Sequence, residues 1–315
     1  MIRSFEIRDI PQLNRYRRRG IFLDSLPTLT WGRTLVPAGA VLSSLTGAAG
    51  VFTAVCQATP EQPEPIIAQV IHNHAAPFAR FTFAAPDSAI DSPVFTPLLE
   101  YLVKRVGARG AQNLIAEADE KTQTFEALRR SGFSIYTRQR VWKIAALPQG
   151  KTAETGWRQV GPSDEFNVRR LYNAMVPALV QQVEPAHWER LRGWVLYKGD
   201  EILAFVDINT GPRGIWSQPF IHPELEDIDL HLADLVGRLG PLKQRPVYVC
   251  LRSYSSWLAL PLQDLGAQPG PHQAVMVKRL AAKIKMPELS PLPTINGGTE
   301  PTTSYYETPA KGDRV

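Results

Sequence analysis

Two side chains stand where they could take up a proton during catalysis. His222 follows a strand candidate at Gly214–Ile221, and an imidazole has a pKa suited to accepting a proton from an amine. Asp207 lies inside a second strand candidate, Ile202–Asn209, where alternation lets its carboxylate face a cleft. Each has a structural alternative, because Pro223 suits a loop-fixing histidine and a half-exposed strand accommodates an aspartate. His222 and Asp207 are therefore the catalytic candidates, with these alternatives open.

A histidine pair suggests a metal site, but the rest of the sequence does not complete it. His72 and His74 lie two residues apart at the end of a strand candidate, so both imidazoles share one face. No third ligand signal accompanies them, whereas zinc sites use three or four protein ligands. Cys56 and Cys250 are 194 residues apart and form no CxxC pair. We predict no metal site and no disulfide framework.

The charge pattern argues against a dedicated nucleic-acid binder. The 315 residues carry a net charge of +5, and one dense basic run is present, Arg15–Arg19. This run lies near the end of an expected helix, Pro11–Arg19, where cations complement the helix dipole. A solvated basic face explains the run, and an anion or nucleic-acid contact is the alternative. We therefore expect no nucleic-acid partner.

Membrane insertion and secretion are not expected either. The uncharged stretch Thr34–Pro60 is interrupted by proline and glycine, whereas a spanning helix needs about 20 predominantly apolar residues. We interpret it as a loop or short helix at Leu35–Thr46, followed by a buried strand at Val51–Cys56. The first residues lack the apolar core of a signal peptide, and two distant cysteines fit a reducing compartment. We predict a cytoplasmic protein without a membrane partner.

Patterned segments predict strands and helices in the same order in both halves of the chain. A 3.6-residue apolar spacing predicts a helix at Val94–Val106, and Gly132 suits the end of a helix at Lys121–Arg130. In the second half, Lys198-Gly-Asp200 predicts a hairpin turn. The other expected strands are an opening strand with Ile2, Phe5 and Ile7, and Ile66–His72, Ala79–Ala84, Asn113–Ala116, Phe133–Ile144, Trp157–Val160, Gly193–Tyr197, Val247–Leu251 and Ala274–Leu280. The other expected helices are one that Ser163 caps and that contains Phe166 and Leu171, and Asp229–Leu239 and Ser256–Leu265.

An internal repeat relates the two halves. When the first half is shifted by 134 positions, Gly132 falls on Gly266 and Gln139 falls on Gln273. Each match is weak alone, but together with the same order of elements they indicate a duplication.

The repeat sets the predicted domain boundaries. A polar segment rich in small residues, 146–156, is interpreted as a linker between domains at 1–145 and 157–285. Residues 286–315 contain five prolines and few aliphatic side chains. Such a segment cannot bury enough surface to offset its ordering entropy, so we predict a disordered tail.

The repeated region resembles a known family. Thr124-Phe-Glu-Ala-Leu-Arg-Arg-Ser-Gly132-Phe133 places a helix that ends in a Gly-Phe pair before the last strand. In the second half, the segment Pro246–Tyr254, which contains the strand Val247–Leu251, leads into Trp257–Gly266. Both segments resemble the C-terminal part of the GNAT (Gcn5-related N-acetyltransferase) fold. The resemblance extends over roughly residues 1–145 and 155–282, and it implies an α/β protein with two tandem GNAT-like domains, each a mixed twisted sheet flanked by helices.

The resemblance also implies a place for acetyl-CoA as co-substrate. A GNAT enzyme holds the pyrophosphate on backbone N–H groups after its fourth strand, where glycine allows close approach. The corresponding loops, Ala84–Pro93 and Ile221–Asp229, lack glycine and carry two and four acidic residues, respectively. The first loop is less acidic and offers serine hydroxyls, so we expect acetyl-CoA in the N-terminal half. The expected contacts are Phe83, Ala84, Ser88 and Ser92.

The tyrosine that often serves the family as general acid is missing. Four residues before the helix-ending glycine stand Leu128 and Leu262, and Tyr254 lies nearby but off register. The resemblance implies acetyl transfer to a small-molecule or peptide amine, with His222 or Asp207 taking the proton. The alternative is a catalytically degenerate GNAT-like binding or scaffold protein. The sequence leaves the acceptor and the oligomeric state open.

Overall fold

The computed structural model describes residues 1–16, 19–33, 50–58, 63–74, 76–145, 155–186, 191–239 and 245–280. All of them belong to one compact unit, Met1–Ala282. The segment expected at Leu35–Thr46, residues 146–154 of the expected linker and the expected disordered tail 286–315 lie outside the described residues. None of the described helices has the length and apolar character that a membrane crossing requires.

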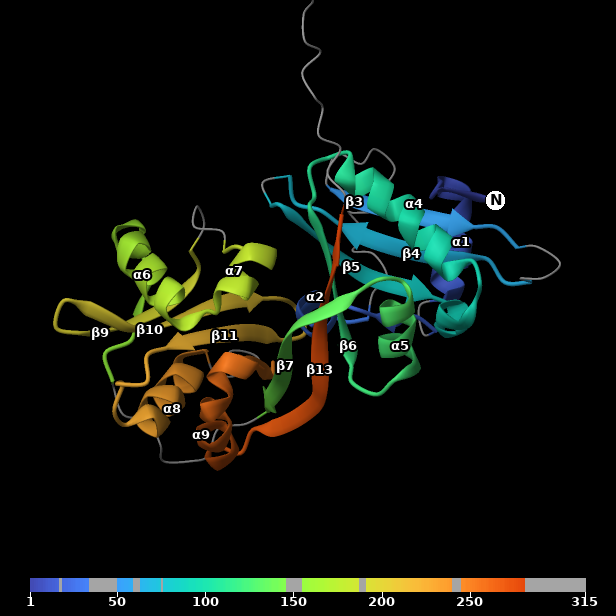
Figure 1. The fold of residues 1–315 in the computed structure, drawn as a ribbon. Coiled ribbons are helices and arrows are strands. Elements are labelled where there is room, and N and C mark those ends of the chain that lie inside the picture. Colours follow the sequence, from blue (N-terminus) through green and yellow to red (C-terminus); the bar gives the residue numbers. More distant parts are fainter. Residues whose placement is uncertain are drawn as a thin grey trace, which may run out of the picture. The chain divides into compact units, whose positions relative to one another are not determined.

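Strands and helices follow one another in a similar order in the two halves (Figure 1). The first half contains β1 (Ile2–Ser4), α1 (Ile10–Arg15), β2 (Ile21–Phe22), α2 (Ser25–Trp31), β3 (Val51–Cys56), β4 (Ile66–Ile71), β5 (Phe78–Ala85), α4 (Phe95–Gly107), β6 (Asn113–Asp119), α5 (Gln123–Arg130) and β7 (Ser134–Ile144). The second half contains β8 (Arg158–Gln159), α6 (Glu165–Met175), α7 (Ala178–Val183), β9 (Gly193–Lys198), β10 (Glu201–Thr210), β11 (Ile215–Ile221), α8 (Ile228–Leu239), β12 (Val247–Arg252), α9 (Ala259–Asp264) and β13 (Gln268–Arg279).

Most of these elements were predicted, and the differences are local. α1 ends at Arg15 rather than Arg19, and β13 begins at Gln268 rather than Ala274. Three elements were not predicted: β2, α2 and α7. Of these, β2 and α2 bear directly on the functional site.

The sheet is mixed, and helices flank it, so the predicted fold class is confirmed. Its strand order is β1-β3-β4-β5-β6-β13-β7-β12-β11-β10-β9-β8. The parallel pairs are β5 with β6 and β11 with β12, and every other pair is antiparallel. The structure adds that the sheets of the two halves are joined edge to edge. The predicted boundaries at 145 and 157 stay predictions.

The halves are joined because their last strands are exchanged. β7 belongs to the first half but pairs with β12 of the second, and β13 pairs with β6 of the first. β7 and β13 lie side by side between the halves (Figure 1). Gln139 faces its repeat partner Gln273 in this ladder, and the Gln139 Nε2 donates to the Gln273 Oε1 at 2.9 Å. An approximate two-fold axis therefore passes between these glutamines.

Helices cover both faces of the sheet in each half. On α4, the apolar residues Leu98, Leu99, Leu102 and Val106 recur at helical spacing and are buried against β3 and β4. Burying each such side chain stabilises the fold by about 1.5–3 kcal/mol. In the second half α8 and α9 belong to one apolar cluster and α6 and α7 to another.

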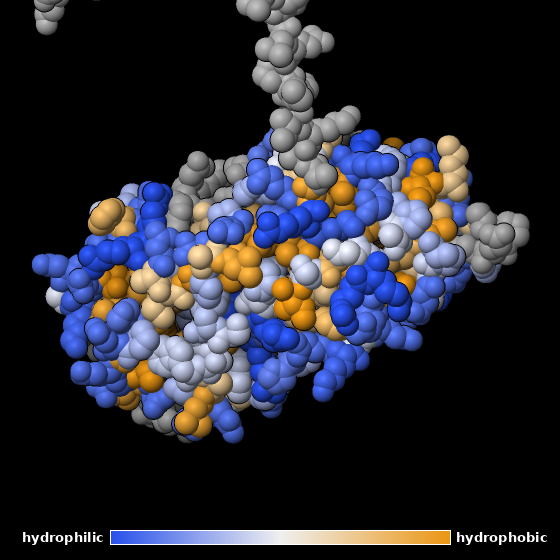
Figure 2. All heavy atoms as spheres, in the orientation of Figure 1, coloured by the Kyte–Doolittle hydropathy of each residue, from blue (hydrophilic) through white to orange (hydrophobic). Residues whose placement is uncertain are grey.

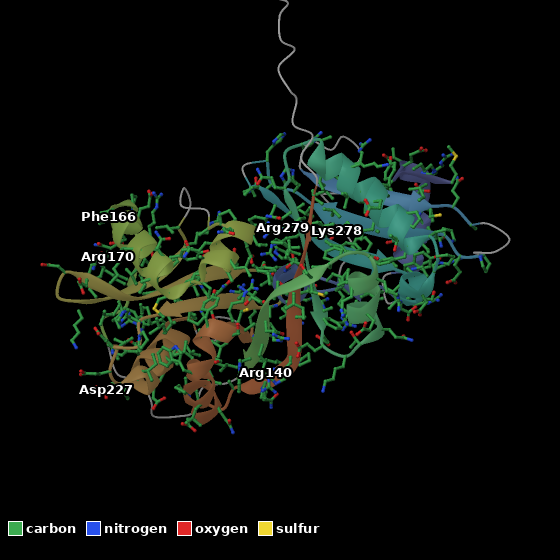
Figure 3. All side chains as sticks on the ribbon, in the orientation of Figure 1. Arg140, Phe166, Arg170, Asp227, Lys278 and Arg279 are labelled. Atoms are coloured by element: carbon green, nitrogen blue, oxygen red, sulfur yellow. The ribbon has the colours of Figure 1, made fainter. Side chains whose placement is uncertain are left out.

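The outer surface follows the same amphipathic rule. α6 buries Val168 and Leu171 and presents Phe166 and Arg170 on its outer side (Figure 3). The face seen in Figure 2 is largely hydrophilic, with apolar residues in small groups. Val168 and Leu171 thus face the sheet, as their spacing predicts, whereas Phe166 is an exposed exception.

One arginine–aspartate motif occurs at the start of both halves. Arg3 forms a bidentate pair with Asp9, both distances being 2.7 Å, and Asp9 accepts a bond from a backbone N–H three residues before it. Arg158 binds Asp164 in the same way at 2.8 and 2.6 Å, again with a backbone N–H three residues earlier. Each motif fixes the chain between the first strand and the first helix of its half. The two motifs are 155 residues apart.

Substituting Asp164 by asparagine should lower the free energy of unfolding by about 1–2 kcal/mol at pH 7, because the charge-assisted bidentate pair with Arg158 is lost. The effect is moderate because the Arg158 side chain is half exposed, so water screens its charge. Hydrogen bonds from Arg158, with further bonds from Tyr197 and a backbone N–H, lower the pKa of Asp164 to about 2. A lowered pKa gives stability that is present above pH 4 and is lost as the pH falls towards 2. Urea titrations at several pH values would measure both effects. Glu165→Gln, in an exposed pair with Arg169, should change stability by less than about 0.5 kcal/mol.

Candidate functional site

The N-terminal half has a gap between its parallel strands, and the chain itself fills it. β5 and β6 pair only from Phe78 to Arg80 and diverge beyond that point. β2 enters the gap and pairs with β5 at Phe83 and Ala84. The Leu23 N–H donates to the Thr82 carbonyl at 2.9 Å, and the Leu23 carbonyl accepts from the Glu117 N–H at 2.8 Å. β2 and Leu23 therefore bridge the two diverging strands.

The position expected for acetyl-CoA is thus occupied by backbone. Phe83 and Ala84, expected along the pantetheine arm, pair with Phe22 and Ile21 and are buried. The next segment, Asp87–Asp91, is a short 3-10 helix rather than an open phosphate loop. Its N–H groups bond internally, with Ser88 N donating to the Asp87 carboxylate at 3.1 Å, and the Ser92 hydroxyl accepts from the Val94 N–H at 3.3 Å. A donor in this half would have to displace β2, which weighs against the expected contacts, and they stay a prediction.

The C-terminal half has the equivalent gap without a strand in it. β11 and β12 pair from Ile215 to Ser217 and then diverge. Within the described ranges, β11 pairs only with β10 and β12, and no segment takes the place that β2 takes in the first half.

A cavity of about 400 Å³ lies over this gap, on the side of the sheet covered by α6 and α7. This volume falls within the usual range of small-molecule sites. The walls combine aromatic rings with a few polar groups, and both halves contribute. The lining residues include Phe78, Arg80, Tyr172, Val180, Glu184, Leu191, Arg192, Phe205, Asp207, Asn209, Gln218, Phe220, Arg252 and Tyr254.

A buried ionic cluster forms one end of the cavity. Arg252, which is 4% exposed, donates from Nη2 to the Glu184 carboxylate at 3.0 Å. The same carboxylate accepts from the Tyr136 hydroxyl at 2.7 Å and from Arg80. Two further nitrogens of Arg252, Nε and Nη1, have no hydrogen-bond partner among the described residues.

The cluster continues into the first half through Arg80. Its guanidinium lies 3.5 Å from the Glu117 carboxylate and 3.8 Å from that of Asp24, both of which are buried. Burial raises the pKa of Asp24 to about 6, with Glu117 acting in the same direction and Arg80 against it. Arg80 is thus the cation shared by three carboxylates from different elements.

Asp207 stands in the cavity wall on β10. Burial raises the pKa of its carboxyl group to about 6, although the Asn209 side chain donates to it at 3.1 Å. Arg192 also lines the cavity and favours the charged form of Asp207. A carboxylate with this pKa can accept a proton near neutral pH. Burial raises the pKa of the Tyr254 hydroxyl in the same cavity, so this group keeps its proton and can donate a hydrogen bond.

Solved structures share this architecture. A GCN5-related N-acetyltransferase from Sphaerobacter thermophilus aligns over 89% of this chain and 95% of its own, with a TM-score of 0.53 and 13% identity. A tandem GNAT protein from the clavulanic acid biosynthesis pathway aligns over 89% of this chain and 98% of its own, with a TM-score of 0.50 and 12% identity. The chain has a tandem GNAT fold. No protein-family model and no curated protein matches the sequence.

Within the GNAT fold, the predicted catalytic residues lie apart. Asp207 lines the cavity, whereas His222 is not among its lining residues. His222 Nδ1 accepts from the Glu224 N–H at 3.3 Å, which is the loop-fixing contact considered as its alternative. His72 is buried, and its Nε2 lies 2.9 Å from the Ala76 carbonyl, so it fixes a turn. The described residues contain no cluster of three or more metal-binding side chains.

The sequence did not reveal Arg252, Glu184 or Arg80 as site residues. Arg252 carried a signal, because it ends the aliphatic strand Val247–Arg252, where an unpaired charge would be costly. Glu184 and Arg80 carried none, since they are far apart in the sequence and the fold brings them together.

The loop beyond the open gap does not suit a pyrophosphate. It holds Glu224, Glu226 and Asp227 just before α8, and Asp229 lies in the first turn of that helix. Asp227 adopts a φ of 50°, and its side chain points outward in Figure 3. Acidic groups at a helix N-terminus compete with a phosphate for the same N–H groups and dipole. The loop beyond the open gap therefore offers no cradle for a pyrophosphate.

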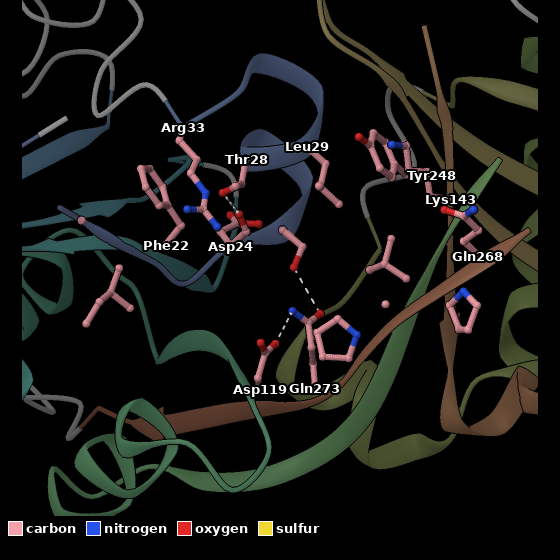
Figure 4. A pocket seen from close by; sticks show the side chains of 17 residues that line it. Phe22, Asp24, Thr28, Leu29, Arg33, Asp119, Lys143, Tyr248, Gln268 and Gln273 are labelled. Carbon is pink, nitrogen blue, oxygen red and sulfur yellow. Dashed lines mark hydrogen bonds between the residues drawn. The ribbon is translucent and has the colours of Figure 1, made fainter. Parts of the chain in front are cut away.

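A second cavity, of about 600 Å³, lies beside the exchanged strands (Figure 4). Its polar floor is a chain in which the Ser25 hydroxyl donates to Gln273 at 3.2 Å and Gln273 donates to Asp119 at 3.1 Å. Arg33 and Lys143 also line it. Asp24, whose carboxyl pKa burial raises to about 6, also lines this cavity, so it holds one group that can take up a proton near neutral pH. It lies in the half whose gap β2 fills, whereas the cavity that contains Asp207 lies over an unfilled gap.

Proposed function

We propose that the chain is a GNAT-type acyltransferase that transfers an acetyl group from a thioester donor to a small amine. The amine binds in the cavity over the β11–β12 gap, and the thioester arm enters through the gap. The observation that carries the proposal is Asp207, a carboxylate with a pKa near 6 in an aromatic-walled cavity above an unfilled gap.

Each polar or aromatic group of the cavity has its own role in the proposed reaction. Asp207 accepts the proton of the ammonium group, which leaves the nitrogen lone pair free to attack the thioester carbonyl. The donor supplies an activated acyl carbon: the C–N bond forms, the C–S bond breaks, and the departing thiolate takes the second proton from the nitrogen and leaves as a free thiol. Tyr254, which keeps its proton, donates a hydrogen bond towards the departing sulfur. Phe205 and Phe220, stacked at 6.0 Å, exclude water from the wall.

The acidic loop before α8 leads to a testable consequence for the donor. Because the loop offers no cradle for phosphates, the nucleotide end should contribute little binding energy. We expect S-acetyl-N-acetylcysteamine, which lacks phosphates, to support transfer with a kcat/KM within about tenfold of that for acetyl-CoA. Mass spectrometry of the acetylated products from a panel of small amines would measure kcat/KM for both donors. A kcat/KM that is a thousandfold higher with acetyl-CoA would contradict the acidic-loop argument and place the nucleotide in a site of its own.

A second candidate function is ligand binding without turnover. Two features favour binding without turnover, because both oppose binding of acetyl-CoA. They are the strand β2 in the first gap and the acidic loop at the second gap. In this case neither thioester would acetylate any amine, while small ligands would still bind the cavity. Failure of transfer with both donors would therefore replace the acyltransferase by this second function.

A further inference from the structure

The cavity over the β11–β12 gap offers a ligand one carboxylate, that of Asp207. Its only side-chain hydrogen bond among the described residues comes from Asn209 at 3.1 Å, and Arg192 acts on it through its charge without forming an ion pair. The other acid in the lining, Glu184, already accepts hydrogen bonds from two guanidinium groups and a tyrosine hydroxyl. A cationic ligand in this cavity therefore finds its partner at Asp207.

The balance of charge in and behind the cavity wall does not favour an anion. Arg252 keeps two nitrogens without partners among the described residues, but both are enclosed by the protein and out of a ligand's reach. In the described part of the chain, the cavity and its ionic cluster combine three guanidinium groups with four carboxylates. They are Arg80, Arg192 and Arg252 on one side and Asp24, Glu117, Glu184 and Asp207 on the other. An excess of carboxylates attracts a cation and repels a second anion.

Three aromatic rings lie beside Asp207 on the same side of the sheet. Asp207 pairs with Gln218 across β10 and β11, and Phe205 pairs with Phe220 one step along the same face. These two rings are stacked at 6.0 Å, and the ring of Tyr172 on α6 lies 5.3 Å from that of Phe220. Residues two apart in a strand are separated by about 7 Å. The carboxylate therefore stands about 7 Å along the strand from an aromatic wall.

We propose that the acceptor is a primary monoamine with an aromatic or other apolar body and without a carboxylate. Its ammonium group binds Asp207, and its body packs on the three rings, which a linker of two or three carbons allows. An ammonium group beside aromatic rings is also attracted by their quadrupoles. A polyamine fits less well, because its second charge would meet Glu184, whose carboxylate is already bonded. This inference rests on the proposed function for its chemistry, but the binding itself does not depend on turnover.

Four probes test this ligand class on the wild-type protein. 2-Phenylethylamine has the proposed form, and L-phenylalanine adds a carboxylate to it. 2-Phenylethanol replaces the ammonium group by a hydroxyl, and 1,4-diaminobutane replaces the apolar body by a second ammonium group. Isothermal titration calorimetry at pH 7 should show that 2-phenylethylamine binds at least about tenfold more tightly than each of the others, because each leaves a charge unpaired or the aromatic wall uncovered. A smaller preference over any of the three, or no binding of 2-phenylethylamine, would overturn the proposal.

Asp207→Asn assigns the ammonium group to this carboxylate. In this variant the affinities of 2-phenylethylamine and 2-phenylethanol should differ by less than about twofold, because neither ligand meets a charge. Asp200→Asn, in the exposed turn between β9 and β10, should keep the wild-type preference. Circular dichroism checks that each variant is folded, and the four-probe comparison on the wild type decides the ligand class even if Asp207→Asn is not. A folded Asp207→Asn protein that keeps the preference for the amine would place the ligand elsewhere and overturn the proposal.

The ligand class and the acyltransferase function can fail separately. Preferential binding of 2-phenylethylamine without acetylation by either thioester would leave the ligand class standing and remove the acyltransferase. Acetylation of L-phenylalanine or 1,4-diaminobutane with a kcat/KM equal to or above that of 2-phenylethylamine would leave the acyltransferase standing and overturn the ligand class.

Discussion

Replacing Arg80 by methionine is expected to lower the free energy of unfolding by about 3–5 kcal/mol at pH 7. Arg80 is the cation that Glu184, Glu117 and Asp24 share, and the last two carboxylates are almost completely buried. Methionine keeps most of the side-chain volume, but it leaves the three carboxylates with Arg252 as the one guanidinium of the cluster. Breaking a buried ionic cluster by removing one sign of charge leaves uncompensated charges, which is the costly case.

The pH dependence of the Arg80 variant distinguishes this explanation from lost packing. Burial already raises the pKa of Asp24 to about 6 in the presence of Arg80. A raised pKa means that stability is present at low pH and is lost as the pH rises through the folded-state value. Arg80→Met should therefore be more stable at pH 5 than at pH 7, because protonation removes the repulsion. Denaturant titrations at both pH values measure this difference, and a deficit that does not change with pH would indicate a packing defect.

A surface arginine serves as the control for Arg80. Arg19 pairs with Glu64 at 3.0 Å, but both side chains are more than 40% exposed. Arg19→Met should leave the denaturation midpoint almost unchanged, since exposed pairs gain little and are screened by water and salt.

The exchange of the last strands was beyond the reach of sequence patterns. Val141 and Trp142 were correctly expected in a strand, and Gln139 was correctly matched to Gln273 by the repeat. Periodicity tells which residues form a strand, but the neighbour of that strand is chosen by tertiary packing. A strand at the end of each half fits equally well beside its own sheet or beside the other, because the repeat makes both edges alike.

The strand beside the expected donor site in the first half could not be predicted for a related reason. The edge of β5 at Phe83 and Ala84 was expected to be free, and β2 occupies it with only two residues. So short a strand has no periodic signal. The gap supplies the partners that make Ile21–Phe22 extended, so this element exists only in the folded context.

The Arg3–Asp9 motif shows what the sequence could have revealed. The same motif recurs at Arg158–Asp164 with a shift of 155, whereas later elements repeat with a shift of 134. The difference of 21 residues is extra chain in the first half between its first strand and β6. A search with one fixed shift misses the first match, although its two anchor residues are identical in type.

The aspartate in the open cavity leads to the second large expected effect. Asp207→Asn should lower kcat/KM for amine acetylation by about 100-fold to 10,000-fold, the usual contribution of a positioned base. In the wild type, kcat/KM should rise with pH through about 6, because the carboxylate is the active form. At pH 5 the rate should be about one tenth of its value on the plateau above pH 7. In Asp207→Asn the rise of kcat/KM near pH 6 should be absent. Any rise at higher pH that comes from deprotonation of the substrate amine should remain.

The free energy of unfolding of Asp207→Asn distinguishes loss of the catalytic base from damage to the fold. Burial raises the pKa of Asp207, so its ionised form at pH 7 costs folding free energy, and that cost grows as the pH rises through about 6. Asparagine removes the charge, so Asp207→Asn should be about 1–2 kcal/mol more stable than the wild type at pH 7. Asp200→Asn, in the exposed turn between β9 and β10, should change neither activity nor stability. An Asp207→Asn protein that is stabilised but still acetylates amines at the wild-type rate would show that another group takes the proton. A protein that is both inactive and less stable would show that Asp207 acts in the fold rather than in the chemistry.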